Sequence, residues 1–539
     1  MVFFGISDKF KDLQLLQDHD LSDWMVAFNT VRYLFPEEIK IYQVLKAIKQ
    51  QKKISEWDKN HLHFLSYDEL KKNFLHDYLI QNTNKIFDNI ELVIPEKKNW
   101  NLKKFPLPAG FLNASDYLKF ICEKRTKELK INKINYQKRL LYELKIIQQK
   151  ELVNYFLLVY DYVDFALKKN ILVGPGRGSS AGSLVAYLLK ITKVDPIKYD
   201  LIFERFLNPK RTKLPDIDLD FEDQKRNQIL KYLINKYGTD YVAQIATFQK
   251  IGFKMAIRDV GRVLNIPLVE INQINKQIPL ECNNDFNLAL KSNLFLQSFQ
   301  KRYSQLFEFA QKLIGLPRQA GIHAAGIVIA NEKLIESVAL WKDDQQNHIL
   351  QAEMTNLENL KLIKMDLLGL RNLTIIGSVL DEIGKGADKN KFLDQIDLED
   401  QITFQNLRTG NTYGIFQLES SGMTQLLKKI QPRNIDEIAL IISLYRPGPM
   451  KNVDELIKRK TFQQKKTFLT NDFNNILNPT YGIPVYQEQI IKMVQIFSNL
   501  SLADAEILRQ AMSKKKLNLL ILLKMFFLKK QKIKVTRYL

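Results

Sequence analysis

The fold of this chain is decided by the stretch LPDIDLDF at residues 214–221, which sets three carboxylates at alternate positions between apolar residues. Successive side chains of a β-strand point to opposite faces, so Asp216, Asp218 and Asp220 share one face while the residues between them face the core. Like charges clustered in this way are costly unless a cation neutralises them, and oxygen ligands without Cys or His favour Mg²⁺ or Mn²⁺ over zinc. The stretch therefore predicts a core strand with a metal-binding face, and the alternative is an exposed strand face.

A Gly- and Ser-rich turn, GPGRGSSAGS at residues 174–183, follows an apolar run and precedes a helical stretch. Glycines let backbone N–H groups approach a ligand closely, Ser hydroxyls add donors, and a helix N-terminus favours anions, so this turn is predicted to hold phosphates. It has neither the Lys-Ser/Thr pair of a Walker A motif nor the GxGxxG spacing of a Rossmann unit, which disfavours both classes. A merely flexible turn is the alternative.

A further carboxylate, Asp366, stands inside the apolar run KMDLLGLR. Isolated buried carboxylates are rare without a partner, and a shared metal ion would supply one; a helix-capping Asp is the alternative. Two strand carboxylates, a third from elsewhere and a phosphate-binding turn are the parts needed for two-metal phosphoryl or nucleotidyl transfer.

Composition places the chain among ordinary folded proteins of several domains, with 539 residues of which 45% are apolar. The formal net charge is +21, but nine basic residues and no acidic one lie in residues 511–539, so charge alone indicates a nucleic-acid partner only weakly. Cys122 and Cys282 lack CxxC spacing, which excludes a disulfide framework and a structural zinc cluster and indicates a reducing compartment. No apolar stretch is long enough for export or for spanning a membrane.

Hydrophobic periodicity predicts a mostly helical chain with short strands near the carboxylates. Helical segments are expected at about 35–90, from Ser115 as N-cap to Lys169 with one helix over 138–169, at about 248–320, and from about Thr374 onward. Short strands are expected at ILV, GIVIA and LKLIKMDLLG. This order is typical of an α+β catalytic core with an inserted helical subdomain.

Eight ordered motifs, within a match that runs from about Asn29 to Lys516, together resemble one family, the alpha subunit of bacterial DNA polymerase III, the replicative C-family polymerase. The motifs are GPGRGSSAGSLVAYLLKIT, FERFLNPKRTKLPDIDLDF, IRDVGRVLNIP, GIHAAGIVIA, LIKMDLLGLRNLTII, GIFQLESSGM, LYRPGPM and PTYGIPVYQEQI. The resemblance implies a palm of the polymerase-beta-like nucleotidyltransferase fold, with a helical thumb inserted in it and helical fingers after it. The implied domains are the end of a polymerase and histidinol phosphatase domain (1–80), first part of the palm (81–247), thumb (248–320), second part of the palm (321–375), incomplete fingers (376–516) and a divergent basic tail (517–539).

The same resemblance assigns site residues. Asp216, Asp218 and Asp366 match the family's catalytic metal ligands, and Asp220 matches a position not counted among them. The implied nucleotide-binding residues are Gly178, Ser179 and Ser183 in the triphosphate turn, and Arg205, Lys364 and Arg446 as triphosphate or template contacts. His323, in GIHAAGIVIA, is expected to support the palm or to contact substrate.

The implied function is a DNA-directed DNA polymerase of chromosomal replication, which adds dNTPs to a primer 3′-hydroxyl with two Mg²⁺ ions, Mn²⁺ being a possible substitute. Its partners would be primed DNA and dNTPs, and the family's sliding clamp and clamp loader, whose attachment regions would lie beyond residue 539. The expected location is the cytoplasm, at the nucleoid. Two alternatives stay open: an inactive remnant that only binds nucleic acid, and a nucleotidyltransferase for small substrates, against which the thumb and finger motifs argue.

Both ends depart from the family. The segment FNTVRYLFPEEIKIYQVLKAIKQ resembles the end of the polymerase and histidinol phosphatase domain, with Arg32 where metal-binding versions carry His, so no proofreading or phosphatase centre is expected. The resemblance stops at Lys516. The acid-free tail is interpreted as out-of-frame translation after an adenine run, and a genuine divergent terminal helix is the alternative.

Overall fold

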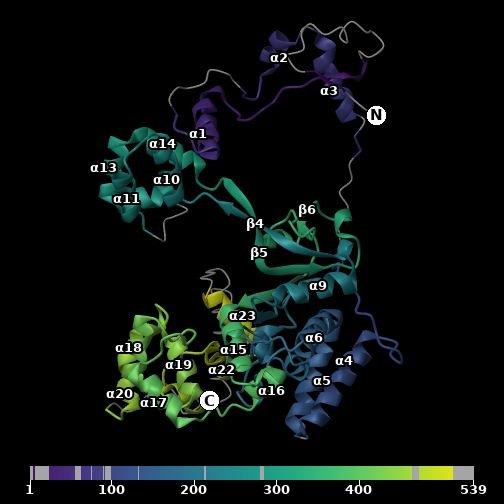
Figure 1. Ribbon diagram of the computed structural model, residues 1–539, viewed down its shortest axis with the longest axis vertical. Coiled ribbons are helices and arrows are strands. Elements are labelled where there is room, and N and C mark those ends of the chain that lie inside the picture. The colour runs from purple at the N-terminus through teal and green to yellow at the C-terminus, as the bar shows by residue number, and fades with distance from the viewer. Residues whose placement is uncertain are drawn as a thin grey trace, which may run out of the picture. The chain divides into compact units, whose positions relative to one another are not determined.

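The computed structural model describes most of the chain, namely residues 4–6, 23–54, 62–74, 76–88, 90–91, 99–131, 133–211, 214–279, 285–463 and 473–513. The tail at 517–539 lies outside the described residues. The chain divides into two compact units, the first made of residues 1–98 and 247–321 and the second of residues 99–246 and 322–539. Figure 1 draws both units.

A six-stranded mixed sheet has the strand order β3-β8-β5-β4-β7-β6. Its strands are β3 (Asp218–Glu222), β4 (Val242–Lys250), β5 (Pro317–Ile329), β6 (Leu340–Lys342), β7 (His348–Leu350) and β8 (Lys364–Leu370). β3 pairs with β8 in parallel, whereas β5 pairs with β8 antiparallel. The expected strands at GIVIA and LKLIKMDLLG are therefore confirmed as parts of β5 and β8, and a mostly helical α+β chain is confirmed with them.

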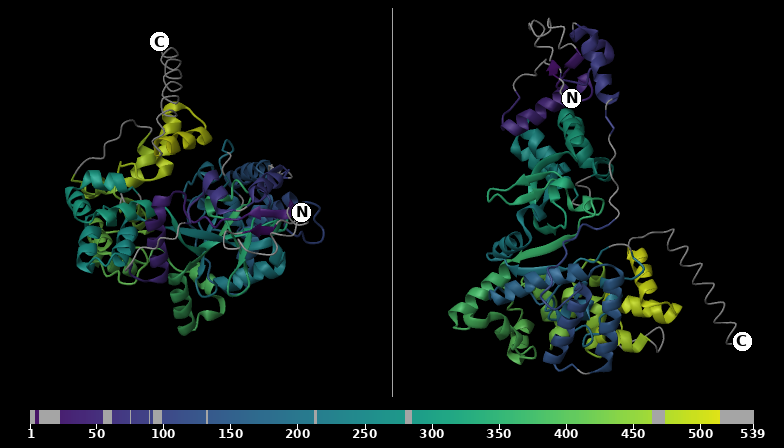
Figure 2. Two further views of the ribbon diagram at one scale, coloured as in Figure 1. Left: turned by 90° about the horizontal axis from the view of Figure 1, so that it is seen from above. Right: turned by 90° about the vertical axis from the view of Figure 1, so that its right-hand side faces the viewer.

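Helices of the second unit cover this sheet: α4 (Ala114–Glu128), α5 (Ile134–Gln149), α6 (Val153–Lys168), α7 (Leu184–Leu188), α8 (Phe203–Phe206) and α9 (Arg226–Tyr237). Helices α4, α5 and α6 lie together in Figure 1, and the same blue segments lie together in both views of Figure 2. α6 is at the centre of the main core, where Tyr155, Phe156 and Tyr162 are fully buried.

Two boundaries predicted from periodicity are wrong. The N-cap of α4 is Asn113, not Ser115, because Asn113 has an extended backbone and its side-chain oxygen accepts the N–H of Asp116 at 2.9 Å. The helix expected over 138–169 is two helices, α5 and α6, because Glu151 between them adopts a left-handed backbone with φ 58°. Apolar periodicity continues across the break, so it gave no sign of the interruption.

After β8 the second unit is helical, as expected from Thr374 onward. The helices are α15 (Arg371–Glu382), α16 (Lys389–Asp394), α17 (Gln401–Thr409), α18 (Ser421–Ile430), α19 (Ile435–Leu444), α20 (Val453–Lys460), α21 (Asn474–Leu477), α22 (Gln487–Ser498) and α23 (Leu502–Ser513). Helices α17 to α20 share a separate small core that includes Leu427, Ile441 and Leu456, each fully buried.

The first unit holds a two-stranded parallel sheet and a helical cluster. Its elements are β1 (Phe4–Ile6), β2 (Met25–Ala27), α1 (Ile39–Gln50), α2 (Tyr67–Asn73), α3 (Asp77–Asp88), α10 (Phe253–Val263), α11 (Leu268–Gln277), α12 (Phe286–Ser292), α13 (Leu294–Arg302) and α14 (Ser304–Leu313). Val44 of α1 shares one core with Phe253 and Phe307, so α1 packs with the helices of the later segment. Among the described residues, the longest apolar helices still fall short of what a membrane crossing requires.

Candidate functional site

Three carboxylates meet at the start of β3 and β8. The parallel register sets Asp218 opposite Asp366, and Asp216 lies two residues before Asp218 on the same side of the chain. One carboxylate oxygen from each of the three lies within 4.8 Å of the others. The second unit therefore brings together two neighbouring acids and one that is far away in sequence.

The alternation expected for LPDIDLDF is present, but the strand is shorter than expected. Ile217, Leu219 and Phe221 are buried, whereas Asp216 is exposed and Asp218 half-buried. β3 begins only at Asp218. Just before it, the N–H of Ile217 donates to the hydroxyl of the buried Tyr155 at 3.1 Å instead of joining the strand ladder.

Lys364 lies among the carboxylates. Its Nζ is 2.6 Å from Asp366 Oδ2 and 3.4 Å from Asp216 Oδ2. Burial raises the pKa of Asp366 to about 7; the neighbouring Asp216 carboxylate adds to the rise, and Lys364 opposes it. The site thus concentrates negative charge on one buried and two accessible carboxylates, with a single ammonium group against it.

The donor set fits a hard divalent cation. Asp366 Oδ1 is buried and accepts no hydrogen bond from any described residue, so this acceptor has lost water without gaining a donor from that part of the chain. All three side chains offer oxygen, which suits Mg²⁺ or Mn²⁺ better than zinc. A cation between the three acids would satisfy that oxygen and offset the repulsion between them.

The glycine-rich turn lies against these acids. Gly178 has φ +69°, and a Cβ there would be 3.4 Å from Asp218 Oδ2. Gly176 has φ +124°, and its Cβ would overlap the side chain of Thr192 at 2.4 Å, so no other residue fits without displacement. The run 171–173, expected as a strand, contributes an isolated antiparallel bridge from Val173 to β3.

The two predicted serines of the turn differ in placement. Ser179 is half-buried, and its carbonyl accepts the N–H of Gly182 at 3.0 Å. Ser183 is fully buried; its hydroxyl donates to Glu143 at 2.8 Å and accepts the N–H of Ala186 at 3.1 Å. The structure therefore places Gly178 beside the acids and the Ser183 side chain in the core.

The two predicted arginines lie on other contacts. Arg205 of α8 donates from Nη1 to Glu488 Oε1 at 2.7 Å and from Nε to Gln487 Oε1 at 3.1 Å, so it connects α8 to α22. Arg446 is exposed just after α19. In the described part of the chain, neither arginine forms an ion pair or a hydrogen bond with the three carboxylates.

Two further groups belong to this region. His323 Nδ1 accepts the N–H of Ala325 at 3.2 Å and of Gly326 at 2.7 Å, so its proton is on Nε2. Burial, followed by the charge of Lys364, lowers its pKa. Glu143 of α5 was missed in the sequence; its one signal was a lone acid in the apolar helical stretch RLLYELKII.

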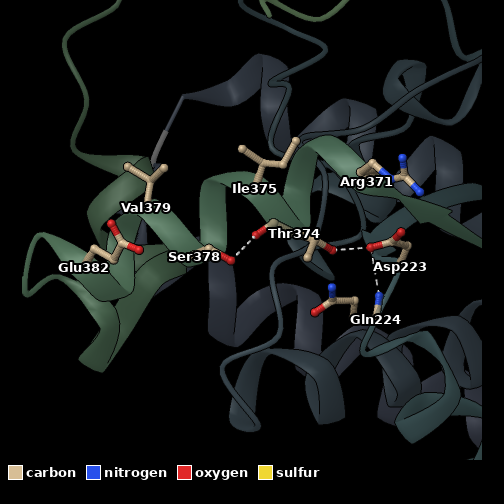
Figure 3. A pocket seen from close by; sticks show the side chains of 8 residues that line it. All are labelled: Asp223, Gln224, Arg371, Thr374, Ile375, Ser378, Val379 and Glu382. Atoms are coloured by element: carbon tan, nitrogen blue, oxygen red, sulfur yellow. Dashed lines mark hydrogen bonds between the residues drawn. The ribbon is translucent and has the colours of Figure 1, made fainter.

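A surface pocket of about 450 Å³ lies where β3 and β8 end, whereas the three acids lie where these strands begin (Figure 3). It is lined by Asp223, Gln224, Arg371, Thr374, Ile375, Ser378, Val379 and Glu382. The Thr374 hydroxyl donates to Asp223 and links α15 to the end of β3. Asp223 and Arg371 follow β3 and β8, whereas the carboxylates lie at the beginning of those strands, so this pocket is separate from the acidic site.

The chain matches two family models. Residues 116–369 match the bacterial DNA polymerase III alpha NTPase domain, and residues 372–533 match the finger domain of the same subunit, so the match continues past Lys516, where the resemblance was expected to stop. The DNA polymerase III subunit alpha of Ureaplasma parvum is 40% identical over 526 residues, which is 96% of this chain and 54% of that protein. The Bacillus subtilis subunit is 40% identical over 505 residues, covering 92% of this chain and 45% of the relative.

These matches agree on one class, because both domain models and the relatives are described as parts of, or as, a DNA polymerase III alpha subunit. The chain belongs to the family of bacterial DNA polymerase III alpha subunits. It spans about half the length of the curated relatives it matches.

Proposed function

We propose that this chain carries the nucleotidyl-transfer site of a DNA-directed DNA polymerase and extends a DNA primer with dNTPs on a template. The observation that supports this most directly is the meeting of Asp216, Asp218 and Asp366 beside a glycine turn, in a chain of the polymerase III alpha family. The proposed substrates are primed DNA and dNTPs. The proposed location is the nucleoid, and the family's sliding clamp and clamp loader would attach to regions beyond residue 539.

The three acids would hold two Mg²⁺ ions, with Mn²⁺ as a possible substitute. When bound, such ions favour deprotonation of the primer 3′-hydroxyl and neutralise charge on the leaving pyrophosphate. The 3′ oxygen forms a bond to the α-phosphorus of the dNTP while the bond to the pyrophosphate oxygen breaks. The chain's own residues position these groups: the acids orient the reacting centre, and the backbone around Gly178 lies beside Asp218, where it can receive the triphosphate.

Lys364 and Arg205 are proposed as triphosphate contacts, and they differ in the acid with which each is paired in the structure. Lys364 already lies 2.6 Å from Asp366, so its ammonium group needs only a side-chain rotation to reach a phosphate oxygen. Arg205 is engaged with Glu488 and must leave that ion pair first. Ser179 and Arg446 are proposed on motif position alone.

The domain names are part of the proposal. We infer a palm from 81–247 and 321–375, a thumb at 248–320, and fingers at 376–516. Residues 247–321 belong to the first compact unit, whereas the three acids belong to the second, which supports an inserted thumb. The separate core of α17 to α20 supports fingers.

Primer extension tests the function. The purified chain, supplied with primed DNA, dNTPs and Mg²⁺, is compared with Asp216→Asn and Asp366→Asn, which keep the side-chain volume but weaken metal binding. We expect extension by the chain and a loss of about 100-fold or more in both variants.

Asp220→Asn is the matched control. Asp220 lies on the same strand face, but it pairs with Arg177 at 3.2 Å and is outside the cluster of three acids. Extension within a few-fold of the unaltered chain is expected for Asp220→Asn. No extension by a folded chain that still binds primed DNA would instead support the inactive, nucleic-acid-binding alternative.

A further inference from the structure

A fully buried acid supports the glycine-rich turn from behind. Glu143 of α5 accepts four hydrogen bonds: Oε1 from Arg139 Nε at 2.6 Å and Leu184 N at 2.9 Å, and Oε2 from Ser183 Oγ at 2.8 Å and Val185 N at 3.0 Å. Three of the four donors belong to the end of the turn and the first residues of α7. The role of this acid is not explained by the metal cluster, because none of its contacts is a carboxylate of the site.

The hydrogen-bond pattern favours the ionised form of Glu143, whereas burial opposes it. Burial raises the pKa of the Glu143 carboxyl, and the Arg139 guanidinium offsets only part of the rise. Three of the four neighbours are N–H groups, which only donate, so a protonated carboxyl could place its O–H only against the Ser183 hydroxyl, whose own proton would then lose its acceptor. A carboxylate satisfies every neighbour, and a charge-assisted hydrogen bond is stronger than a neutral one.

Arg139 extends the same support to a second segment. Its Nη2 donates to the carbonyl of Gly182 at 2.7 Å and to the carbonyl of Leu201 at 3.2 Å. The two segments touch directly, because a Cβ at Gly182 would lie 2.8 Å from the carbonyl oxygen of Ile202. The Arg139–Glu143 pair therefore joins the turn to the chain that leads into α8.

The pair also decides which donors of the turn are free for a phosphate. The N–H groups of Leu184 and Val185 are taken by Glu143, and that of Ala186 is taken by the Ser183 hydroxyl. The Glu143 carboxylate therefore occupies the position at the start of α7 where an anion would bind. The expectation that this helix start would hold a phosphate is wrong. A phosphate must use the earlier part of the turn, around Gly178, which lies beside Asp218.

We propose that Glu143 is a positioning residue for the nucleotide: through Ser183 and the start of α7 it holds the turn in the shape that sets Gly178 against Asp218. This inference deepens the proposed function and rests on it for the identity of the nucleotide. The shape of the turn itself is independent of that function and is tested separately.

Amide hydrogen exchange tests the shape without any reaction. Glu143→Gln keeps the side-chain volume, but its NH₂ group would face donors. The amides of Leu184 and Val185 should exchange about tenfold faster or more in this variant, because each loses a hydrogen bond to a charged acceptor. Ser183→Ala removes one donor to Glu143 and leaves the carboxylate paired with Arg139, so the exchange of the same amides should become faster by a smaller factor. This variant replaces Glu143→Gln in the test if Glu143→Gln does not fold.

Asp161→Asn is the matched control. Asp161 is a buried acid that accepts hydrogen bonds from Tyr232, Tyr237 and Lys236, between α6 and α9. Its variant should leave exchange at Leu184 and Val185 unchanged. Equal exchange in Glu143→Gln and the unaltered chain, or an equal effect of Asp161→Asn, would overturn the proposal.

Steady-state extension then tests the consequence for the nucleotide. Glu143→Gln should raise the KM for dNTP about tenfold while kcat changes by less than about threefold, since the acid acts through the turn and contacts no reacting atom. A fall in kcat with unchanged KM would refute the positioning role. If the unaltered chain extends no primer, the proposed function fails, and the exchange result still decides whether Glu143 holds the turn.

Discussion

Replacing Lys364 by Met should make the stability of the second unit depend on divalent cations. In the structure Lys364 Nζ is the cation beside Asp366 Oδ2, and the Asp366 side chain is only 3% exposed. Removing one partner of a buried ion pair costs about 3–5 kcal/mol. The Asp366 carboxyl, with a pKa of about 7, can take up a proton when Lys364 is lost, and Asp216 is 52% exposed, so the lower value, about 3 kcal/mol, is an upper bound for Lys364→Met.

Thermal unfolding with and without 10 mM Mg²⁺ measures this change. A loss of about 3 kcal/mol corresponds to a fall in Tm of about 4 °C for a domain of several hundred residues. Mg²⁺ bound to the three acids of the folded state restores stability by mass action. The Mg²⁺-induced rise in Tm should therefore be at least about twice as large for Lys364→Met as for the unaltered chain, in which the ammonium group competes with the ion.

Lys225→Met is the matched control for this measurement. Lys225 Nζ lies 2.8 Å from Glu222 Oε2, another carboxylate that is 3% exposed, but Glu222 is outside the cluster of three acids. Its variant should lose stability without any extra gain from Mg²⁺. A gain from Mg²⁺ that is no larger in Lys364→Met than in the unaltered chain would refute the metal site, and an equal gain in Lys225→Met would show that the effect is unspecific.

Further predictions concern the turn and the helical core after it. Gly176→Ala should lower stability by about 2–4 kcal/mol in urea unfolding, since its φ is +124° and its Cβ would overlap a side chain; Gly110→Ala, at φ +94° with open space, should cost only about 1 kcal/mol. Burial raises the pKa of Glu437, but hydrogen bonds from Lys460 and Tyr481 lower it by more than burial raises it, so the net shift of the pKa is downward. The ion pair therefore stabilises the fold above about pH 4.5 and loses that effect as the pH falls; Glu437→Gln should flatten the pH dependence of Tm between pH 3 and 5. Arg205→Met should increase trypsin cleavage around α22, because it removes the ion pair between α8 and α22; unchanged cleavage would argue against that contact.

The sequence predicted the local part of the site and missed the part built from distant contacts. The alternation around Asp216 and Asp218 depends only on the period of a β-strand, so the shared face and the buried residues between the acids followed directly. That Asp366 would lie with Asp216 and Asp218 was expected from its apolar neighbours and from the resemblance. The structure adds the strand register, which sets Asp366 opposite Asp218. The carboxylate that accepts the Ser183 hydroxyl, Glu143, and the Glu488 side chain that pairs with Arg205 lie on helices far away in sequence, for which no local pattern exists.

The same distinction applies to the fold. The helical stretches were predictable because their apolar residues repeat every three or four positions. The strand β4 was missed because its residues, VAQIATFQK, are buried almost continuously at the start and do not alternate. The break at Glu151 was missed because a left-handed backbone at one residue leaves the apolar pattern intact. Tertiary contacts, not local preference, decided both.

The parallel pairing of β3 with β8 has a consequence for the order in which the molecule can form. Asp218 leaves the ribosome long before its register partner Asp366, and the whole segment between them must emerge first. Closing so long a loop costs entropy that rises only slowly with length, about 0.6 kcal/mol for each doubling. The acidic centre can therefore form only after Asp366 has been synthesised, and the segment between β4 and β5 can change in length with little effect on it.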